Sequence, residues 1–239
     1  MYKNTDKHHY FKNRDDAAVQ MIDTLPLEMF TENETVVIGV SEGGVYFADK
    51  IAQKIDARMD ILLTEAVFAP NNPELPIAMI SETDEVVIHK ALVEAFDISE
   101  DYIYSEAQRK YEDEVLAYVY KYRKGSDMVS LEGKYVILSD ECIETGLTMT
   151  VALKSVIARG AKNIYIATPI LDKVVYETLL ALCDGVFCPY KIQDYILAEY
   201  YYENFESLPF EEIIKIVDKY KEKKINPMKD SQTDAKTPQ

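Results

Sequence analysis

The sequence contains little of what builds covalent or metal frameworks. Among its 239 residues there is no tryptophan, and there are only three cysteines and three histidines. Three cysteines are too few and too odd in number for a disulfide framework, and no Cys/His spacing predicts a zinc site. We therefore expect Cys142, Cys183 and Cys188 to be free thiols and the histidines to lie on the surface.

Positive charge is also scarce. Lys and Arg number 26 against 42 Asp and Glu, which gives a formal net charge of −16. A phosphate backbone would repel such an acidic chain, so we expect no nucleic-acid partner. No run approaches the roughly 18 apolar residues of a membrane span, and the polar N-terminus lacks the apolar centre of a secretory signal. We expect a cytoplasmic protein with no membrane partner.

Hydrophobic residues are plentiful, at 48% of the chain, and can bury a full core. Short β-rich runs alternate with amphipathic stretches, which predicts an α/β fold with a mostly parallel sheet and helices on both faces. The expected strands are 35–40, 59–63, 135–138, 164–167 and 186–188, and the expected helices are 45–55, 99–124, 149–159, 174–182 and 207–224. Residues 71–76 interrupt this pattern, and 77–80 with 86–88 are expected to form a short hairpin.

The most informative segment follows the expected strand at 135–138. Two adjacent acids, Asp140 and Glu141, are followed by the string TGLT at 145–148, which opens a helix. A helix start offers unpaired N–H groups and partial positive charge, and Gly146 lets the backbone approach a ligand, so this string suits a phosphate. The acids can accept hydrogen bonds from vicinal hydroxyls and help to hold Mg²⁺. Ribose 5-phosphate would span both parts; an acidic strand end before a capped helix is the alternative.

Several segments resemble type I phosphoribosyltransferases. ILSDECIETGLTMT at 137–150 is similar to the phosphoribosyl diphosphate (PRPP) motif of that family: an apolar strand, two acids, variable residues and a Thr-Gly-x-Thr loop. Other segments resemble a bacterial branch of the family, namely FKNRDDA at 11–17, GVSEGGVYFA at 39–48, NPEL at 72–75 and YENF at 202–205. In order and spacing the resemblance covers roughly residues 11–215.

The resemblance implies binding of PRPP with Mg²⁺ and transfer of its phosphoribosyl group to a small nucleophile, commonly a nucleobase, with loss of diphosphate. It implies that Asp140 and Glu141 hold the ribose hydroxyls and, through water, the metal, and that Glu144 and Asp140 are catalytic, Glu144 as general base. The 5-phosphate loop would be Thr145, Gly146, Leu147 and Thr148, and the diphosphate loop would be Ser41, Glu42, Gly43 and Gly44. Carboxylates near the ribose suit an oxocarbenium-like transition state.

We expect one phosphoribosyltransferase-like domain over residues 1–225, and a disordered tail over 226–239 because that segment is polar. The N-terminal segment and residues 189–225 would form a small hood subdomain over the strand ends. The tyrosine-rich stretch at 190–202 could stack on a base, or could equally make core or dimer contacts. A homodimer is the common expectation for such a protein.

Two positions depart from the family pattern. Glu42 stands where Arg or Lys usually precedes Gly-Gly, and Thr64-Glu65-Ala66 stands where a basic pair is usual. An acid beside a diphosphate is repulsive unless a metal bridges the two. The alternatives are an enzyme rebuilt around metal, a protein for a less charged ligand, or a non-catalytic nucleotide- or PRPP-binding regulator.

A dinucleotide-binding protein is the rival enzyme hypothesis. GVSEGG at 39–44 matches G-x-G-x-x-G except at Ser41, and Glu65 follows about twenty residues later, where a ribose-binding acid is expected. This degenerate glycine pattern leaves the string at 140–148 unexplained, so we rank the hypothesis lower.

Overall fold

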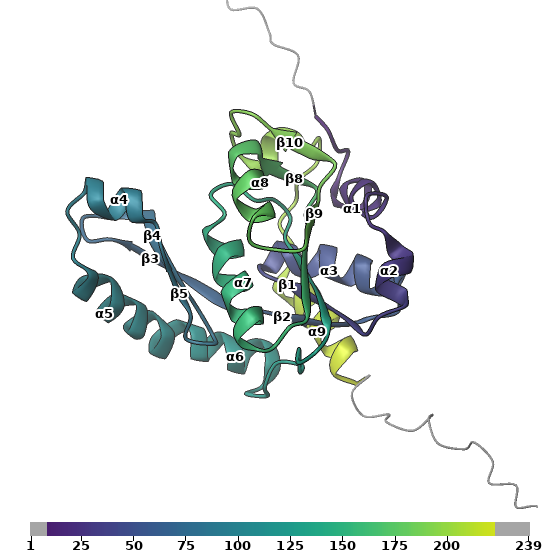
Figure 1. Cartoon of the computed structure of the whole chain (residues 1–239), viewed down its shortest axis with the longest axis horizontal. Helices are drawn as coiled ribbons and strands as arrows, with labels where there is room; N and C mark the ends of the chain where they lie inside the picture. The colour runs from purple at the N-terminus through teal and green to yellow at the C-terminus, as the bar shows by residue number, and fades with distance from the viewer. Residues whose placement is uncertain (1–8, 223–239) are drawn as a thin grey trace, which may run out of the picture.

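A five-stranded sheet forms the centre of the computed structural model, which describes residues 9–222 (Figure 1). All neighbouring strands are parallel. Their order is β2 (Arg58–Ile61), β1 (Thr35–Gly39), β6 (Tyr135–Ser139), β7 (Asn163–Ala167) and β9 (Gly185–Phe187). The tail expected at 226–239 lies outside the described residues.

Helices cover both faces of this sheet, which confirms the predicted fold class. On one face Val37 and Ile137 pack against α1 (Arg14–Ile22), α3 (Glu42–Lys54) and α9 (Phe210–Glu222). On the other face Val36 and Val136 pack against α7 (Leu147–Ala158) and α8 (Lys173–Leu180). A parallel sheet buried on both faces needs the continuous apolar runs that its strands contain. Between residues 9 and 222, no helix combines the length and apolar character that a bilayer crossing requires.

The N-terminal segment and the segment around residue 202 meet beside the sheet. Phe11 pairs with Tyr202 in an isolated parallel bridge, and the amides of Tyr10 and Phe11 both donate to the carbonyl of Tyr201. The remaining elements of this region are the short helix α2 (Leu27–Thr31), the paired strands β8 (Ile170–Asp172) and β10 (Tyr190–Ile192), and a 3-10 turn at Ala198–Tyr201.

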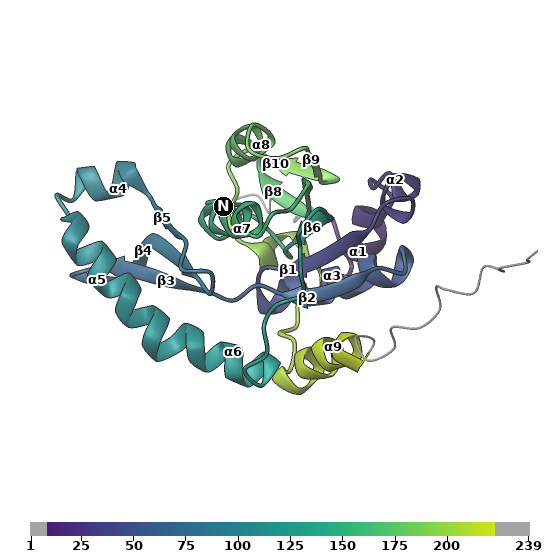
Figure 2. The same ribbon diagram turned by 60° about the horizontal axis from the view of Figure 1, so that its bottom comes forward.

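Along the chain, β2 and β6 are separated by a smaller structure that projects from the sheet (Figure 2). We call its residues, 64–123, the arm. It has its own core, which includes Ile77, Ile80, Ile103 and Val115. Its elements are β3 (Thr64–Ala69), β4 (Asn72–Ser81), β5 (Val86–Ile88), α4 (Lys90–Ala95), α5 (Glu100–Lys110), a π-helical turn at Tyr111–Val115 and α6 (Leu116–Arg123).

The arm confirms two local predictions and corrects a third. The hairpin exists, with Ala78 opposite Ile88, and the long helix starts at a Ser99 side chain that accepts from the amide of Tyr102. Residues 71–76, expected to break the pattern, instead lie largely within β4. Because β5 pairs only with residues 78–80, the prolines of β4 lie where the strand has one neighbour, and a missing N–H is tolerated there.

Buried polar contacts fix the base of the arm to the sheet. The guanidinium of Arg123, only 2% exposed, pairs with Glu82, lies 3.8 Å from Asp60 and donates to the carbonyl of Ile61 at 3.2 Å. On the other side Ser155 of α7 donates to Ser81 at 2.8 Å. The arm is therefore anchored to both β2 and α7.

Candidate functional site

The carboxyl ends of β1 and β6 bring two predicted loops together. Gly39 and Ser139 are register partners, so the residues that follow them are neighbours. Ser41 donates a hydrogen bond to Oδ1 of Asp140 at 2.5 Å and accepts one from the amide of Gly44 at 2.8 Å. Ser41 thus caps α3 and also ties the 41–44 loop to the first acid of the pair.

The two glycines of this loop are required by close contact. A Cβ on Gly44 would lie 2.5 Å from the carbonyl oxygen of Ser139, and one on Gly43 would lie 2.1 Å from Oε2 of Glu141. A side chain at position 44 would meet backbone and push the loop away from the acid pair, whereas one at position 43 would displace the Glu141 carboxylate. The start of α3 leaves the amides of Glu42 and Gly43 without intrahelical acceptors, so they can bind an anion.

Asp140 lies deep at the end of β6, with 9% of its surface exposed. Burial raises the pKa of its carboxyl to about 7; the hydrogen bond from Ser41 opposes that rise and the charge of Glu141 adds to it. Near neutral pH this carboxyl therefore exists in both protonation states. A ligand that donates hydrogen bonds to it would favour the ionised form.

Glu141 is held by the N-terminal segment. Arg14 forms an ion pair with its carboxylate, places its guanidinium 4.1 Å from the ring centroid of Phe205 and donates from Nε to the carbonyl of Glu206 at 3.2 Å. The FKNRDDA, PRPP-like and YENF segments therefore meet at one side chain. Sequence reasoning did not assign Arg14 a role.

The loop at residues 144–148 leads into α7. Gly146 has a φ of +74°, which favours glycine, and a Cβ there would lie 2.8 Å from Cγ1 of Val175. Glu144 and Thr145 are exposed, Thr148 is half-buried and Leu147 is buried. In the first turn of α7 the amides of Thr148 and Met149 have no intrahelical acceptor, whereas that of Leu147 donates to Oγ1 of Thr145 at 3.4 Å.

The two acids at usually basic positions both contact the long helix of the arm. The hydroxyl of Tyr122 donates to Oε1 of Glu42. Nζ of Lys110 lies 3.5 Å from Glu65 and 2.6 Å from Glu114. Glu65 lies in β3, not at the end of β2, and its contact with Lys110 gives it a structural partner that the dinucleotide hypothesis did not foresee.

A cavity of about 260 Å³ opens beside the acid pair. Its lining combines one cation, three carboxylates and a short apolar wall, and consists of Arg14, Glu42, Gly43, Glu141, Glu199, Phe205, Ser207 and Leu208. Sequence reasoning missed Glu199, Ser207 and Leu208; the YENF resemblance was the one signal near them. Glu144 and residues 145–148 do not line this cavity.

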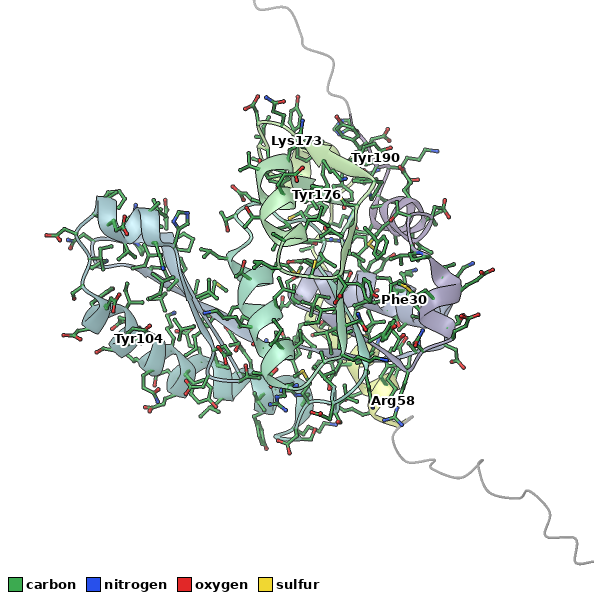
Figure 3. All side chains as sticks on the ribbon, in the orientation of Figure 1. Phe30, Arg58, Tyr104, Lys173, Tyr176 and Tyr190 are labelled. Atoms are coloured by element: carbon green, nitrogen blue, oxygen red, sulfur yellow. The ribbon has the colours of Figure 1, made fainter. Side chains whose placement is uncertain are left out.

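The tyrosine-rich stretch contributes mainly to packing. Tyr201 and Tyr202 are 3% and 2% exposed, and Tyr190, labelled in Figure 3, places its ring 4.5 Å from that of Tyr10. These contacts favour the core role over base stacking for these three tyrosines. Helix α9, which contains the end of the expected hood segment, packs against α3 and β2.

The site offers oxygen donors that fit Mg²⁺. Within residues 9–222 no group of three or more Asp, Glu, His or Cys side chains is arranged to hold a metal alone. Asp140 and Glu141 are carboxylates, which Mg²⁺ accepts, and this ion commonly takes one or two protein ligands and completes its shell with water and substrate phosphate. The donor set therefore fits an ion that arrives with a phosphorylated ligand.

Cys142 lies inside the motif but is a poor nucleophile. All three cysteines are free and partly buried. Burial first, and the charge of Asp140 second, raise the pKa of the Cys142 thiol to about 12, and burial raises that of Cys188 to about 12. The sequence predicted this direction for Cys142 from its acidic neighbours, whereas the structure makes burial the larger cause.

Thiol titration checks this assignment. At about pH 8 the native protein should react with a chromogenic disulfide reagent roughly 100-fold more slowly than a free cysteine, because the thiolate is the reacting form. In denaturant all three cysteines should react at once. One fast thiol in the native protein would show that a cysteine is exposed and activated.

Known proteins share sequence with most of this chain. The family model described as phosphoribosyl transferase domain matches residues 5–203. The chain belongs to this phosphoribosyltransferase family. A protein from two strains of Mycobacterium tuberculosis, whose name describes it provisionally as a phosphoribosyl transferase, is 26% identical over 216 residues. That match covers 87% of this chain and 46% of the relative, so the chain spans about half the length of these relatives.

A solved structure has the same fold as this chain. The crystal structure of the Thermus thermophilus protein TT1426 superposes with a TM-score of 0.73 at 26% sequence identity. The match covers 88% of this chain and 98% of the Thermus chain. The likeness extends over most of both chains.

Proposed function

We propose that this phosphoribosyltransferase-like chain binds PRPP with Mg²⁺ and transfers the phosphoribosyl group to a nucleobase-like acceptor. One observation carries the proposal: the N-termini of α3 and α7 follow the carboxyl ends of adjacent strands, with Asp140 and Glu141 between them. Ligands of open α/β sheets bind at such strand ends. The proposal includes a cytoplasmic location and a homodimer.

Each part of PRPP has a partner in this arrangement. The amides of α7 and the hydroxyls of Thr145 and Thr148 would bind the 5-phosphate, and Asp140 and Glu141 would accept from the ribose hydroxyls. The amides of residues 41–44 would bind the diphosphate. When bound, Mg²⁺ would neutralise charge on the diphosphate.

The reaction would exchange one bond at C1 of the ribose. The bond from C1 to the diphosphate oxygen breaks with its electron pair on diphosphate, and a nitrogen of the acceptor forms the new bond to C1. Glu144, exposed beside the loop, would take the proton that this nitrogen loses. The carboxylate of Asp140, buried below the ribose, would stabilise positive charge that develops on the sugar.

Glu42 and Glu65 favour a second candidate, a regulator that binds PRPP or a nucleotide without transferring the sugar. Calorimetric titration with PRPP, with and without Mg²⁺, tests binding, and release of diphosphate against a nucleobase panel separates the two candidates. Absence of binding of PRPP and of ribose 5-phosphate at any Mg²⁺ level would contradict both.

Gly146→Ala should weaken binding of ribose 5-phosphate at least about tenfold, because the new methyl group meets Val175 and displaces the phosphate loop. Gly133→Ala is the matched control, since its φ of +70° is similar and a Cβ there has no neighbour within 4 Å. Calorimetry of both variants checks this. If both variants bound ribose 5-phosphate with equal affinity, the 5-phosphate would not bind at this loop.

A further inference from the structure

Glu42 is the residue that most opposes an anion at the 41–44 loop, yet the structure gives its carboxylate a partner. That partner is the hydroxyl of Tyr122 at the end of α6 in the arm. Glu42 is the first residue of α3 and is exposed. Without the contact its side chain could therefore rotate over the amides of residues 41–44. Glu42 lines the 260 Å³ cavity and Tyr122 does not, so the hydrogen bond joins the edge of the cavity to the arm.

Tyr122 is held firmly enough to fix the position of the Glu42 carboxylate. Its side chain is 3% exposed, its ring meets that of Phe210 edge-on at 5.6 Å, and its carbonyl accepts from Nζ of Lys221 at 2.5 Å. The next residue, Arg123, is the buried cation that anchors the arm. Burial, with the hydrogen bond to Glu42, raises the pKa of the Tyr122 hydroxyl, so it remains a donor at neutral pH.

The same helix engages the second acid that stands at a usually basic position. Lys110 lies 3.5 Å from Glu65, about three helical turns before Tyr122. One helix of the arm therefore compensates both departures from the family pattern. The contact with Glu65 lies within the arm, whereas the contact between Tyr122 and Glu42 joins the arm to the 41–44 loop.

We propose that Tyr122 is a positioning residue that holds the Glu42 carboxylate away from the 41–44 amides and so makes this loop able to accept diphosphate. The inference rests on the proposed function for its ligand. It gives the arm a role in the site, which is to remove a like charge from the loop. Tyr122 itself touches neither the substrate nor the reacting atoms.

The test measures binding of inorganic diphosphate and of ribose 5-phosphate by calorimetry at low salt and fixed low Mg²⁺. Tyr122→Phe removes the donor and keeps the ring, so the Glu42 carboxylate is released. Diphosphate affinity should fall about five- to tenfold, and added salt should reduce that loss, because screening weakens exposed charges. Affinity for ribose 5-phosphate should stay unchanged. Tyr118→Phe is the control, since no hydrogen bond of Tyr118 to Glu42 is present in the described structure.

Rescue separates positioning from simple damage to the fold. Glu42→Gln in the Tyr122→Phe background removes the released charge and should restore the diphosphate affinity of wild type. A loss that Glu42→Gln does not rescue would overturn the inference, as would a Tyr122→Phe variant with unchanged diphosphate affinity.

Failure of this inference and failure of the proposed function give different results. If diphosphate binding depends on Tyr122 while ribose 5-phosphate does not bind, the inference stands and the proposed function fails. If ribose 5-phosphate binds but diphosphate does not bind to wild type, the inference is wrong and the phosphate loop of the proposed function remains.

Discussion

Asparagine at position 140 is expected to stabilise the ligand-free protein above pH 7 and to abolish tight binding of a ribose 5-phosphate ligand. The folded protein holds this carboxyl with a pKa of about 7, against 3.8 for the ordinary group. Between these values the unfolded chain loses its proton first, so the wild type loses stability as the pH rises from about 4 to about 7. Well above pH 7 the penalty is constant, about 4 kcal/mol.

The Asp140→Asn variant keeps the packing but lacks the charge. Its side-chain oxygen can still accept from Ser41 and from the amide of Glu141, as the wild-type oxygen does at 2.5 and 2.8 Å. Its stability should therefore not fall over this pH range. Loss of charge-assisted hydrogen bonds to the ribose should cost more than about 2 kcal/mol of binding free energy.

Denaturant unfolding of both proteins between about pH 4 and pH 9, in the presence of a chelator, checks the stability part, and calorimetry with PRPP and Mg²⁺ checks the binding part. Asp127→Asn, at an exposed carboxylate, is the control and should change neither. A variant that is less stable than wild type at every pH would show that Asp140 is a structural acceptor. Unchanged affinity for PRPP would show that Asp140 does not bind the ribose.

Arg123→Met should cost about 3–5 kcal/mol of the free energy of unfolding, because it leaves Glu82 and Asp60 buried with no cation between them. Glu82 is also fixed by the chain, since its Oε1 accepts from the amide of Leu63 at 2.9 Å. The loss should be smaller in the double variant with Glu82→Gln, because one unpaired charge is then removed. Both effects are measured by urea unfolding.

Arg58→Met is the matched control for this prediction. Arg58 lies at the exposed start of β2, at the lower edge of the molecule in Figure 3. Its replacement should change stability by less than about 0.5 kcal/mol. If Arg123→Met behaved like this control, the buried ion pair would contribute nothing to anchoring the arm.

The sheet was predictable because its strands carry a local signal. Residues 35–40 and 135–138 are continuous apolar runs, and each is followed by a glycine-containing loop and an amphipathic helix. The arm was only partly predictable. β3 contains Glu65 and half-buried residues, so its pattern does not distinguish a strand, and its partner β4 contains two prolines.

The candidate site was also only partly predictable from the sequence. The acid pair and both loops were readable because each lies within one short segment. The Arg14–Glu141 and Tyr122–Glu42 contacts were not, since they join residues 127 and 80 positions apart. Such pairs depend on how the N-terminal segment and the arm pack on the sheet, which no local pattern in a single sequence contains.

The π-helical turn at Tyr111–Val115 determines which way the end of the arm helix faces. Such a turn holds one residue more than an α-helical turn of the same rise, and each residue rotates an α-helix by about 100°. If the same residues instead formed one continuous α-helix, everything after this turn would be rotated by about that angle. The hydroxyl of Tyr122 would then leave Glu42, and the guanidinium of Arg123 would leave Glu82. The π-helical turn therefore sets the orientation from which Tyr122 reaches the 41–44 loop and Arg123 reaches its buried partners.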